Sequence, residues 1–138
     1  MAVRLDGAAL AAKLKTRIRA EAAALIRPPM LAVVLAGEDP ASQIYVRGKE
    51  RDCAECGIRT RTHRLPASVS QEDLLVLVDS LNRDEDVDGV LVQLPLPEGL
   101  DPRPVLHALS PEKDVDCFHP LNTGLLALGE PRFLPCTP

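Results

Sequence analysis

Tyrosine and lysine, two residue types that can move protons, share one face of a helix expected over residues 40–56. Tyr45 and Lys49 are four positions apart, so the ring and the amine are neighbours, and Lys49 is the only charged residue on that face. A lysine held against apolar surface loses solvation of its charged form, which lowers its pKa and lets it accept a proton near neutral pH. The alternative is that Lys49 extends along the helix edge into solvent, as lysines commonly do.

A polar residue, Gln93, follows an apolar run in the strand that we expect over residues 87–94. Ligands of open parallel sheets bind beyond the carboxyl ends of the strands, which gives most weight to residues 37–42 and 93–97. The Gln93 amide can reach into a cleft at this end, or it can cap backbone groups of the turn that follows. Position alone leaves both roles open.

Two carboxylates at alternate positions, Asp114 and Asp116, occupy a charged loop over residues 113–119. Such a pair can bind a cation or a guanidine-like heterocycle, because carboxylates accept paired N–H donors well. His119 precedes a proline, and we expect a structural role for it. Ser42 has no evident base partner and the chain carries no glycine-rich phosphate-binding motif, so neither a nucleophilic triad nor a phosphate loop is predicted.

Four cysteines, Cys53, Cys56, Cys117 and Cys136, raise the alternative of a zinc or thiol-redox protein. Cys53 and Cys56 form a CxxC pair, but the other two lie far along the chain and far from each other, whereas structural zinc sites usually offer a second close pair. We therefore expect no metal site and no disulfide framework, with the cysteines serving as small buried hydrophobic residues. Near-stoichiometric zinc in purified protein would support the alternative.

The composition predicts one globular domain that binds neither nucleic acid nor membranes. The chain has 138 residues, of which 46% are hydrophobic and 26% charged, enough for a core without disulfides. Few residues are aromatic and the net charge is -4, both unfavourable for binding nucleic acid. No apolar run approaches the ~18 residues that cross a bilayer, which suggests a cytoplasmic protein. We interpret the acidic bias of residues 68–101 as solvated helix faces.

The remaining pattern predicts alternating helices and strands. An N-terminal helix capped by Asp6 continues toward the prolines at 28–29, with an apolar stripe formed by Leu10, Ala11, Leu14, Ile18, Ala22 and Leu25. Strands are expected over residues 30–36, 58–65 and 87–94, and helices over 40–56, 71–81 and 104–109, with Asp39 and Ser70 as caps. This order implies right-handed crossovers and a mainly parallel sheet covered on both faces, an α/β/α sandwich.

Five motifs extend over nearly the whole chain: DPAS at 39–42, YVRGK at 45–49, VQLPLP at 92–97, KDVDCFHP at 113–120 and PCTP at 135–138. Together they resemble the methylenetetrahydrofolate dehydrogenase/cyclohydrolase family, FolD. The resemblance implies an enzyme of one-carbon metabolism that oxidises 5,10-methylenetetrahydrofolate with NADP and hydrolyses the methenyl product to 10-formyltetrahydrofolate. It also implies the three-layer sandwich of an amino-acid-dehydrogenase-like N-terminal domain.

The resemblance further implies roles for six residues. Lys49 is similar to the family's catalytic lysine, Gln93 to the glutamine that hydrogen-bonds and tunes it, and Tyr45 to the tyrosine that stacks on the folate. Asp116 resembles the aspartate that anchors the pterin ring through its N–H donors, with Val92 and Leu94 as backbone neighbours in the pocket. One departure is Cys117, at a position where the family usually has glycine.

By this resemblance, residues 1–138 form one tetrahydrofolate-binding catalytic domain, and the NADP-binding Rossmann domain of the family lies outside them. We therefore expect the isolated chain to lack dehydrogenase activity and to show at most weak cyclohydrolase activity. The expected partners are tetrahydrofolate derivatives and, as is common in the family, a second copy in a homodimer. The alternative is a non-catalytic folate-binding or docking module that has the same fold.

Overall fold

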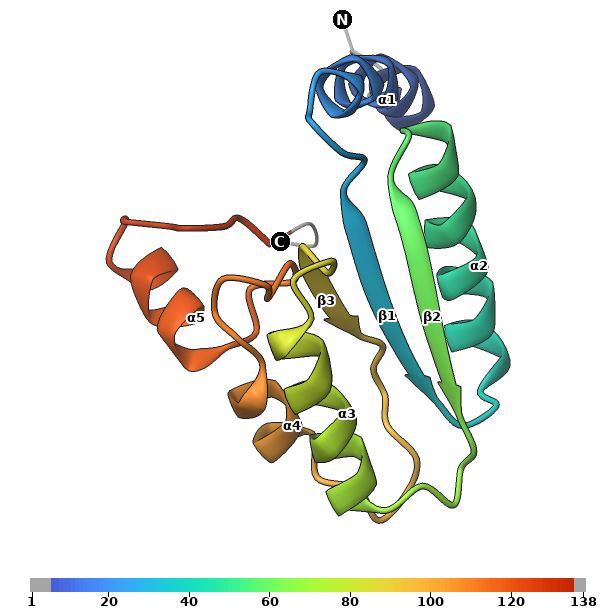
Figure 1. The fold of residues 1–138 in the computed structure, drawn as a ribbon, viewed down its shortest axis with the longest axis vertical. Helices are drawn as coiled ribbons and strands as arrows, with labels where there is room; N and C mark the ends of the chain where they lie inside the picture. Colours follow the sequence, from blue (N-terminus) through green and yellow to red (C-terminus); the bar gives the residue numbers. More distant parts are fainter. Residues whose placement is uncertain (1–5, 136–138) are drawn as a thin grey trace, which may run out of the picture.

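A three-stranded parallel sheet forms the centre of the molecule. The computed structural model describes residues 6–135, and its strands are β1 (Met30–Ala36), β2 (Arg59–Leu65) and β3 (Gly89–Val92), in the order β2-β1-β3 (Figure 1). β1 pairs with β2 along its whole length and with β3 from Leu31 to Val34. Because both pairings are parallel, the carboxyl ends of the strands lie at the same end of the sheet.

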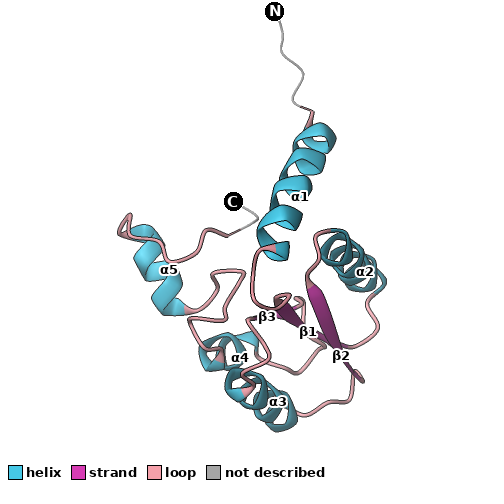
Figure 2. Ribbon diagram, turned by 45° about the horizontal axis from the view of Figure 1, so that its top comes forward, coloured by secondary structure: helices cyan, strands magenta, loops and turns pink. Residues whose placement is uncertain are grey.

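Helices cover both faces of this sheet. α2 (Pro40–Glu55) connects β1 to β2 and packs on one face, while α3 (Gln71–Arg83) and α4 (Pro102–Ala108) pack on the other (Figure 2). α2 and α3 therefore act as the crossover connections between strands that follow one another in the chain and run parallel. The predicted α/β/α sandwich with a mainly parallel sheet is confirmed.

The central strand supplies side chains to two separate cores. Val33 and Leu35 pack against Val46 of α2, whereas Ala32 and Val34 pack in the core beneath α3 and α4. All four β1 residues are at most 2% exposed. Burial of one valine side chain stabilises a fold by about 1.5–3 kcal/mol, so β1 is a rigid support for whatever lies at its carboxyl end.

Side-chain caps define where the helices begin. Asp39 accepts a hydrogen bond from the Ser42 backbone N–H at 2.7 Å, and Ser70 accepts one from Asp73 at 3.0 Å. α4 begins in the same way at Asp101. The predicted caps at Asp39 and Ser70 are therefore confirmed, because a cap needs only neighbours three residues away.

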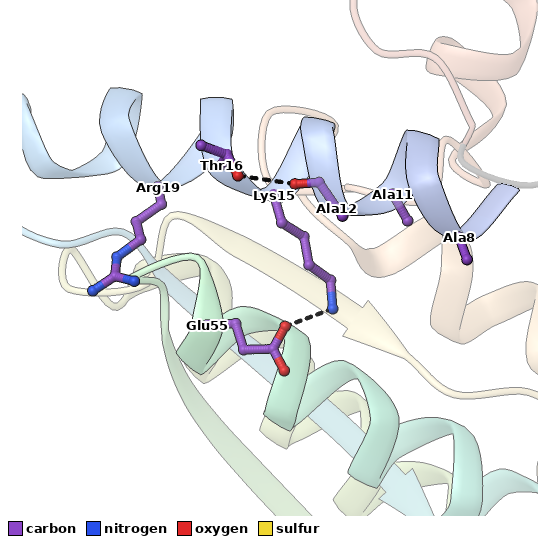
Figure 3. Close-up of a pocket in the computed structure, with 7 residues that line it drawn as sticks. All are labelled: Ala8, Ala11, Ala12, Lys15, Thr16, Arg19 and Glu55. Atoms are coloured by element: carbon purple, nitrogen blue, oxygen red, sulfur yellow. Dashed lines mark hydrogen bonds and ion pairs between the residues drawn. The ribbon is translucent and has the colours of Figure 1, made fainter. Parts of the chain in front are cut away.

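α1 (Gly7–Ala23) lies beyond the amino ends of the strands (Figure 1). Lys15 joins it to α2, with Nζ 2.8 Å from the Asp52 carboxylate and 2.7 Å from that of Glu55; Figure 3 shows the second contact. The apolar stripe expected on this helix is largely exposed: in α1 only Ala22 is buried, and Leu10 is 58% exposed.

Two further elements differ from the sequence-based expectation. β3 spans four residues rather than residues 87–94. α5 (Pro120–Ala127) was not predicted, since an apolar run after a proline offers little helical pattern; His119 caps it, with Nδ1 accepting the Leu121 N–H at 3.1 Å. None of the helices within residues 6–135 has both the length and the apolar character needed to cross a bilayer.

Candidate active site

The amine of Lys49 and the amide of Gln93 meet at the carboxyl end of the sheet. Lys49 Nζ donates a hydrogen bond to Gln93 Oε1 at 3.0 Å, and both residues are half-buried. α2 supplies the lysine from one side of the sheet, and the chain leaving β3 supplies the glutamine. The lysine thus reaches a partner inside the fold rather than extending only into solvent.

The orientation of the Gln93 amide is fixed by a second bond. Its Nε2 donates to the carbonyl oxygen of Leu94 at 2.7 Å, and its backbone N–H donates to Val34 of β1 at 2.9 Å. The amide nitrogen is therefore occupied, and Oε1 is the atom presented to Lys49. The capping role that the sequence left open is realised, and the same side chain also accepts a hydrogen bond from the Lys49 amine.

The turn after Gln93 packs closely over the end of β1. Gly37 has a left-handed φ of 82°, and a Cβ on it would lie only 3.1 Å from the ring of Pro97. A larger residue at this position would be strained and would push the turn away. The side chain of Val92 is buried in the core, which leaves only its backbone for a ligand, and Leu94 is half-buried.

Tyr45 lies one helical turn before Lys49 and is 66% exposed. Tyr45 and Lys49 line an open hollow of about 490 Å³ on α2, together with Ile44, Arg47 and Gly48. An exposed ring beside an amine suits stacking on a flat ligand, because the ring face is free.

Asp116 brings a negative charge toward this end of the sheet. Its loop is attached to β3 by a parallel bridge between Val90 and Asp114, with the Val90 N–H donating to Lys113 at 2.7 Å. Burial raises the pKa of the Asp116 carboxyl, and the nearby Lys49 ammonium acts in the opposite direction, while the Asp114 charge adds to the increase. The Lys49 ammonium is therefore close enough to act on the Asp116 carboxyl.

Asp114 does not form a cation-binding pair with Asp116. Its carboxylate points into the protein and accepts hydrogen bonds from the backbone of Phe118 and His119 and from the Asn122 side chain. Asn122 is itself fully buried. Sequence reasoning missed this residue, and the signal available was a polar side chain in the first turn of an otherwise apolar segment.

The cysteines do not support the zinc or thiol-redox alternative. Burial raises the pKa of the Cys53 thiol, which disfavours the thiolate that metal binding and redox exchange need. Cys56 and Cys117 are buried, and Cys136 lies outside the described residues. Within residues 6–135 no three His, Cys, Asp or Glu side chains gather as metal ligands do.

Comparisons with known proteins agree with this geometry. A family model described as the catalytic domain of tetrahydrofolate dehydrogenase/cyclohydrolase matches residues 5–116. The bifunctional protein FolD of Nitratidesulfovibrio vulgaris (strain DSM 19637 / Miyazaki F) is 58% identical over 138 residues, a match that covers 97% of this chain and 48% of that protein. FolD of Acidiphilium cryptum is also 58% identical, with the same coverage.

Solved structures give the same result. The bifunctional FolD enzyme from Campylobacter jejuni superimposes with a TM-score of 0.93 at 44% identity, over 96% of this chain and 48% of that chain. The FolD of Trypanosoma brucei, solved with NADP and an inhibitor, has a TM-score of 0.94 at 40% identity, over 99% and 48%. The chain spans about half the length of these relatives, and it belongs to the tetrahydrofolate dehydrogenase/cyclohydrolase family, matching the model of its catalytic domain.

Proposed function

We propose that this chain is the folate-binding, catalytic part of an enzyme that oxidises 5,10-methylenetetrahydrofolate and hydrolyses the methenyl product to 10-formyltetrahydrofolate. The observation that carries this proposal is the 3.0 Å hydrogen bond between Lys49 and Gln93 at the carboxyl end of the sheet. Relatives named as bifunctional FolD, 58% identical across the chain, support the choice of substrate.

Hydrolysis requires one proton to leave the attacking water. The water oxygen bonds to the cationic methenyl carbon and loses this proton to the free amine of Lys49. The bond from that carbon to N5 then breaks, N5 takes the second proton of the water, and the formyl group remains on N10. Lys49 is the group that accepts and relays the proton, while Gln93 holds its amine in place. The Tyr45 ring stacks on the folate, and Asp116 accepts paired N–H donors of the pterin.

The oxidation needs NADP, and the residues described here do not fit that cofactor. A dinucleotide pyrophosphate usually rests on a glycine-rich turn at a helix N-terminus. The corresponding turn after β1 carries Asp39, and the N–H of Ser42 holds the pKa of this carboxyl below its usual range. A carboxylate at this place repels phosphate. We therefore assign NADP binding to a part of the enzyme outside these residues.

The test measures the loss of 5,10-methenyltetrahydrofolate absorbance with the 138-residue chain. We expect acceleration over buffer, and we expect Lys49→Met to reduce it by about 100-fold or more, as for other general bases. Lys13→Met, at an exposed lysine of α1, is the matched control and should hydrolyse at the wild-type rate. We also expect no NADP reduction when 5,10-methylenetetrahydrofolate is supplied.

Two outcomes would overturn parts of this proposal. A folded chain that binds tetrahydrofolate without accelerating hydrolysis would be a non-catalytic folate-binding module. NADP reduction by the 138 residues alone would contradict the assignment of the cofactor to another part of the enzyme.

A further inference from the structure

Asp114 is a buried carboxylate that accepts three hydrogen bonds from residues that follow it in the chain. It is 1% exposed. Its Oδ1 accepts the Phe118 N–H at 3.2 Å, and its Oδ2 accepts the His119 N–H at 2.8 Å and Asn122 Nδ2 at 2.9 Å. Burying a carboxylate is unfavourable unless such donors stay in place, so Asp114 keeps these three groups gathered around it.

These bonds close a loop whose base is fixed to the sheet and to α3. Asp114 itself forms the bridge to Val90 of β3. The neighbouring Lys113 Nζ donates to the carbonyl oxygens of Leu81 at 3.1 Å and Asp84 at 2.7 Å, at the end of α3. The loop is therefore anchored on both sides of Asp116. The bridge and the Lys113 hydrogen bonds hold the part before it, and the hydrogen bonds that Asp114 accepts hold the part after it.

Asp116 lies inside this closed loop. Its own carboxylate accepts no hydrogen bond from the side chains or backbone of residues 6–135, so its position depends on the path of the loop backbone. Cys117, the next residue, has a left-handed backbone conformation. L-residues disfavour this conformation, so the path of the loop depends further on the hydrogen bonds to Asp114.

We propose that Asp114 is a positioning residue: it fixes the loop so that the Asp116 carboxylate faces the end of the sheet where Lys49 and Gln93 meet. Asp114 touches no ligand in this role and acts through Asp116. The assignment rests on the proposed function, in which Asp116 binds the pterin ring.

The test is a double-mutant cycle on folate binding, measured by calorimetry with 5-formyltetrahydrofolate at a temperature where every variant is folded. Asp114→Asn keeps the size of the side chain but replaces one acceptor oxygen with a donor. We expect it to weaken binding about 10- to 100-fold, the size of effect that misplacing a contact group can have. In an Asp116→Ala background, adding Asp114→Asn should cause no further loss.

A merely structural role predicts different results. Asp88→Asn is the matched control, because Asp88 also accepts a backbone N–H, that of Met30, at the opposite end of the sheet. It should leave binding unchanged. Two results would overturn the proposal. One is a loss of folate affinity with Asp88→Asn as large as that with Asp114→Asn. The other is an equal loss of affinity from Asp114→Asn in the wild-type and the Asp116→Ala backgrounds.

Failure of the proposed function has its own signature, which is a folded wild-type chain that does not bind the folate. Positioning is then still decided by amide hydrogen exchange. Asp114→Asn should speed exchange at Phe118 and His119 while leaving β1 protected, and unchanged exchange at these two amides would overturn the proposal.

Discussion

The backbone of Cys117 is strained at the residue that follows Asp116. Its φ is 61°, in the left-handed region, and its side chain is only 5% exposed. In this conformation the Cβ of an L-residue crowds a carbonyl oxygen, which costs about 1–2 kcal/mol, whereas glycine avoids that contact. The chain tolerates the strain because the loop around Asp114 determines the conformation and the thiol is packed.

Substitutions at Cys117 should therefore reverse the usual order of alanine and glycine. We expect Cys117→Gly to be more stable than Cys117→Ala by about 1 kcal/mol, measured by urea unfolding. Cys53 lies inside α2 and provides the control: there alanine should be more stable than glycine by about 1 kcal/mol. If Cys117→Ala were as stable as Cys117→Gly, or more stable, the backbone at this position would not be strained.

The site could be predicted only as far as it depends on local pattern. Helical spacing places Tyr45 and Lys49 on one face, and the end of an apolar run marks Gln93. The role of Asp114 could not be predicted, since it depends on donors that come together only when the loop folds back as far as Asn122. Local spacing suggested a carboxylate pair instead, whereas in the fold the Asp114 carboxylate is taken up by hydrogen bonds inside the protein.

For the helices and strands too, features set by neighbours in sequence could be predicted, and features set by distant contacts could not. The caps of α2 and α3 and the burial of β1 follow from neighbours in sequence, so they were predicted correctly. The exposure of α1 could not be predicted, because helical spacing marks an apolar face but not whether another element packs against it. α5 was missed because its cap, His119, is an uncommon residue for that position.

β3 and the loop over residues 113–116 approach too closely for any side chain at Gly89. A Cβ placed there would lie 2.5 Å from Val115 Cγ1. We expect Gly89→Ala to lower the free energy of unfolding by about 1–3 kcal/mol through overpacking. Adding Val115→Ala should recover part of this loss, because it removes the clashing methyl group. If the two substitutions lowered the free energy of unfolding additively in the double variant, the clash between residues 89 and 115 would not be the cause.

α1 should open more readily than the sheet. Only Ala22 of this helix is buried, and its ion pairs to α2 are partly exposed, so little free energy opposes local unfolding. We expect its amides to exchange with deuterium faster than those of β1, and Lys15→Ala to increase that difference. Equal protection of α1 and β1 would show that α1 is covered by another molecule in solution.

Across the whole molecule, part of the acidic run over residues 68–101 pairs with arginines instead of remaining solvated. Asp84 lies 2.6 Å from Arg61, and Asp88 lies 2.7 Å from Arg27. These pairs join the turn after α3 to β2 and to the segment before β1. The interpretation as solvated helix faces is therefore wrong for this turn, because the arginines come from elements that are distant in sequence.

These pairs predict how stability depends on pH. The Arg27 guanidinium holds the pKa of the Asp88 carboxyl below its usual range. The backbone N–H of Asp86 and the Arg61 guanidinium lower the pKa of the Asp84 carboxyl in the same way. A carboxyl whose pKa is lower in the folded state stabilises the fold above its unfolded pKa of about 3.9, and that stabilisation disappears as the pH falls through the folded pKa. These two carboxyls should thus leave the melting temperature unchanged from about pH 7 to 5 and lower it below about pH 4. Burial also lowers the pKa of His63, which should add a small decrease in melting temperature as the pH falls through about 6.5.

Asp88→Asn isolates the contribution of one pair to this acid transition. At neutral pH the variant should melt a few degrees below the wild type, because it loses the charge that faces Arg27. The difference should shrink as Asp88 becomes protonated in the wild type, since both proteins then carry a neutral side chain. Asp79→Asn is the control, because within residues 6–135 Asp79 pairs only with Arg83, on the exposed face of α3. It should change the melting temperature little at any pH. A difference for Asp88→Asn that persists in acid would mean that hydrogen-bond geometry, rather than charge, gives Asp88 its effect.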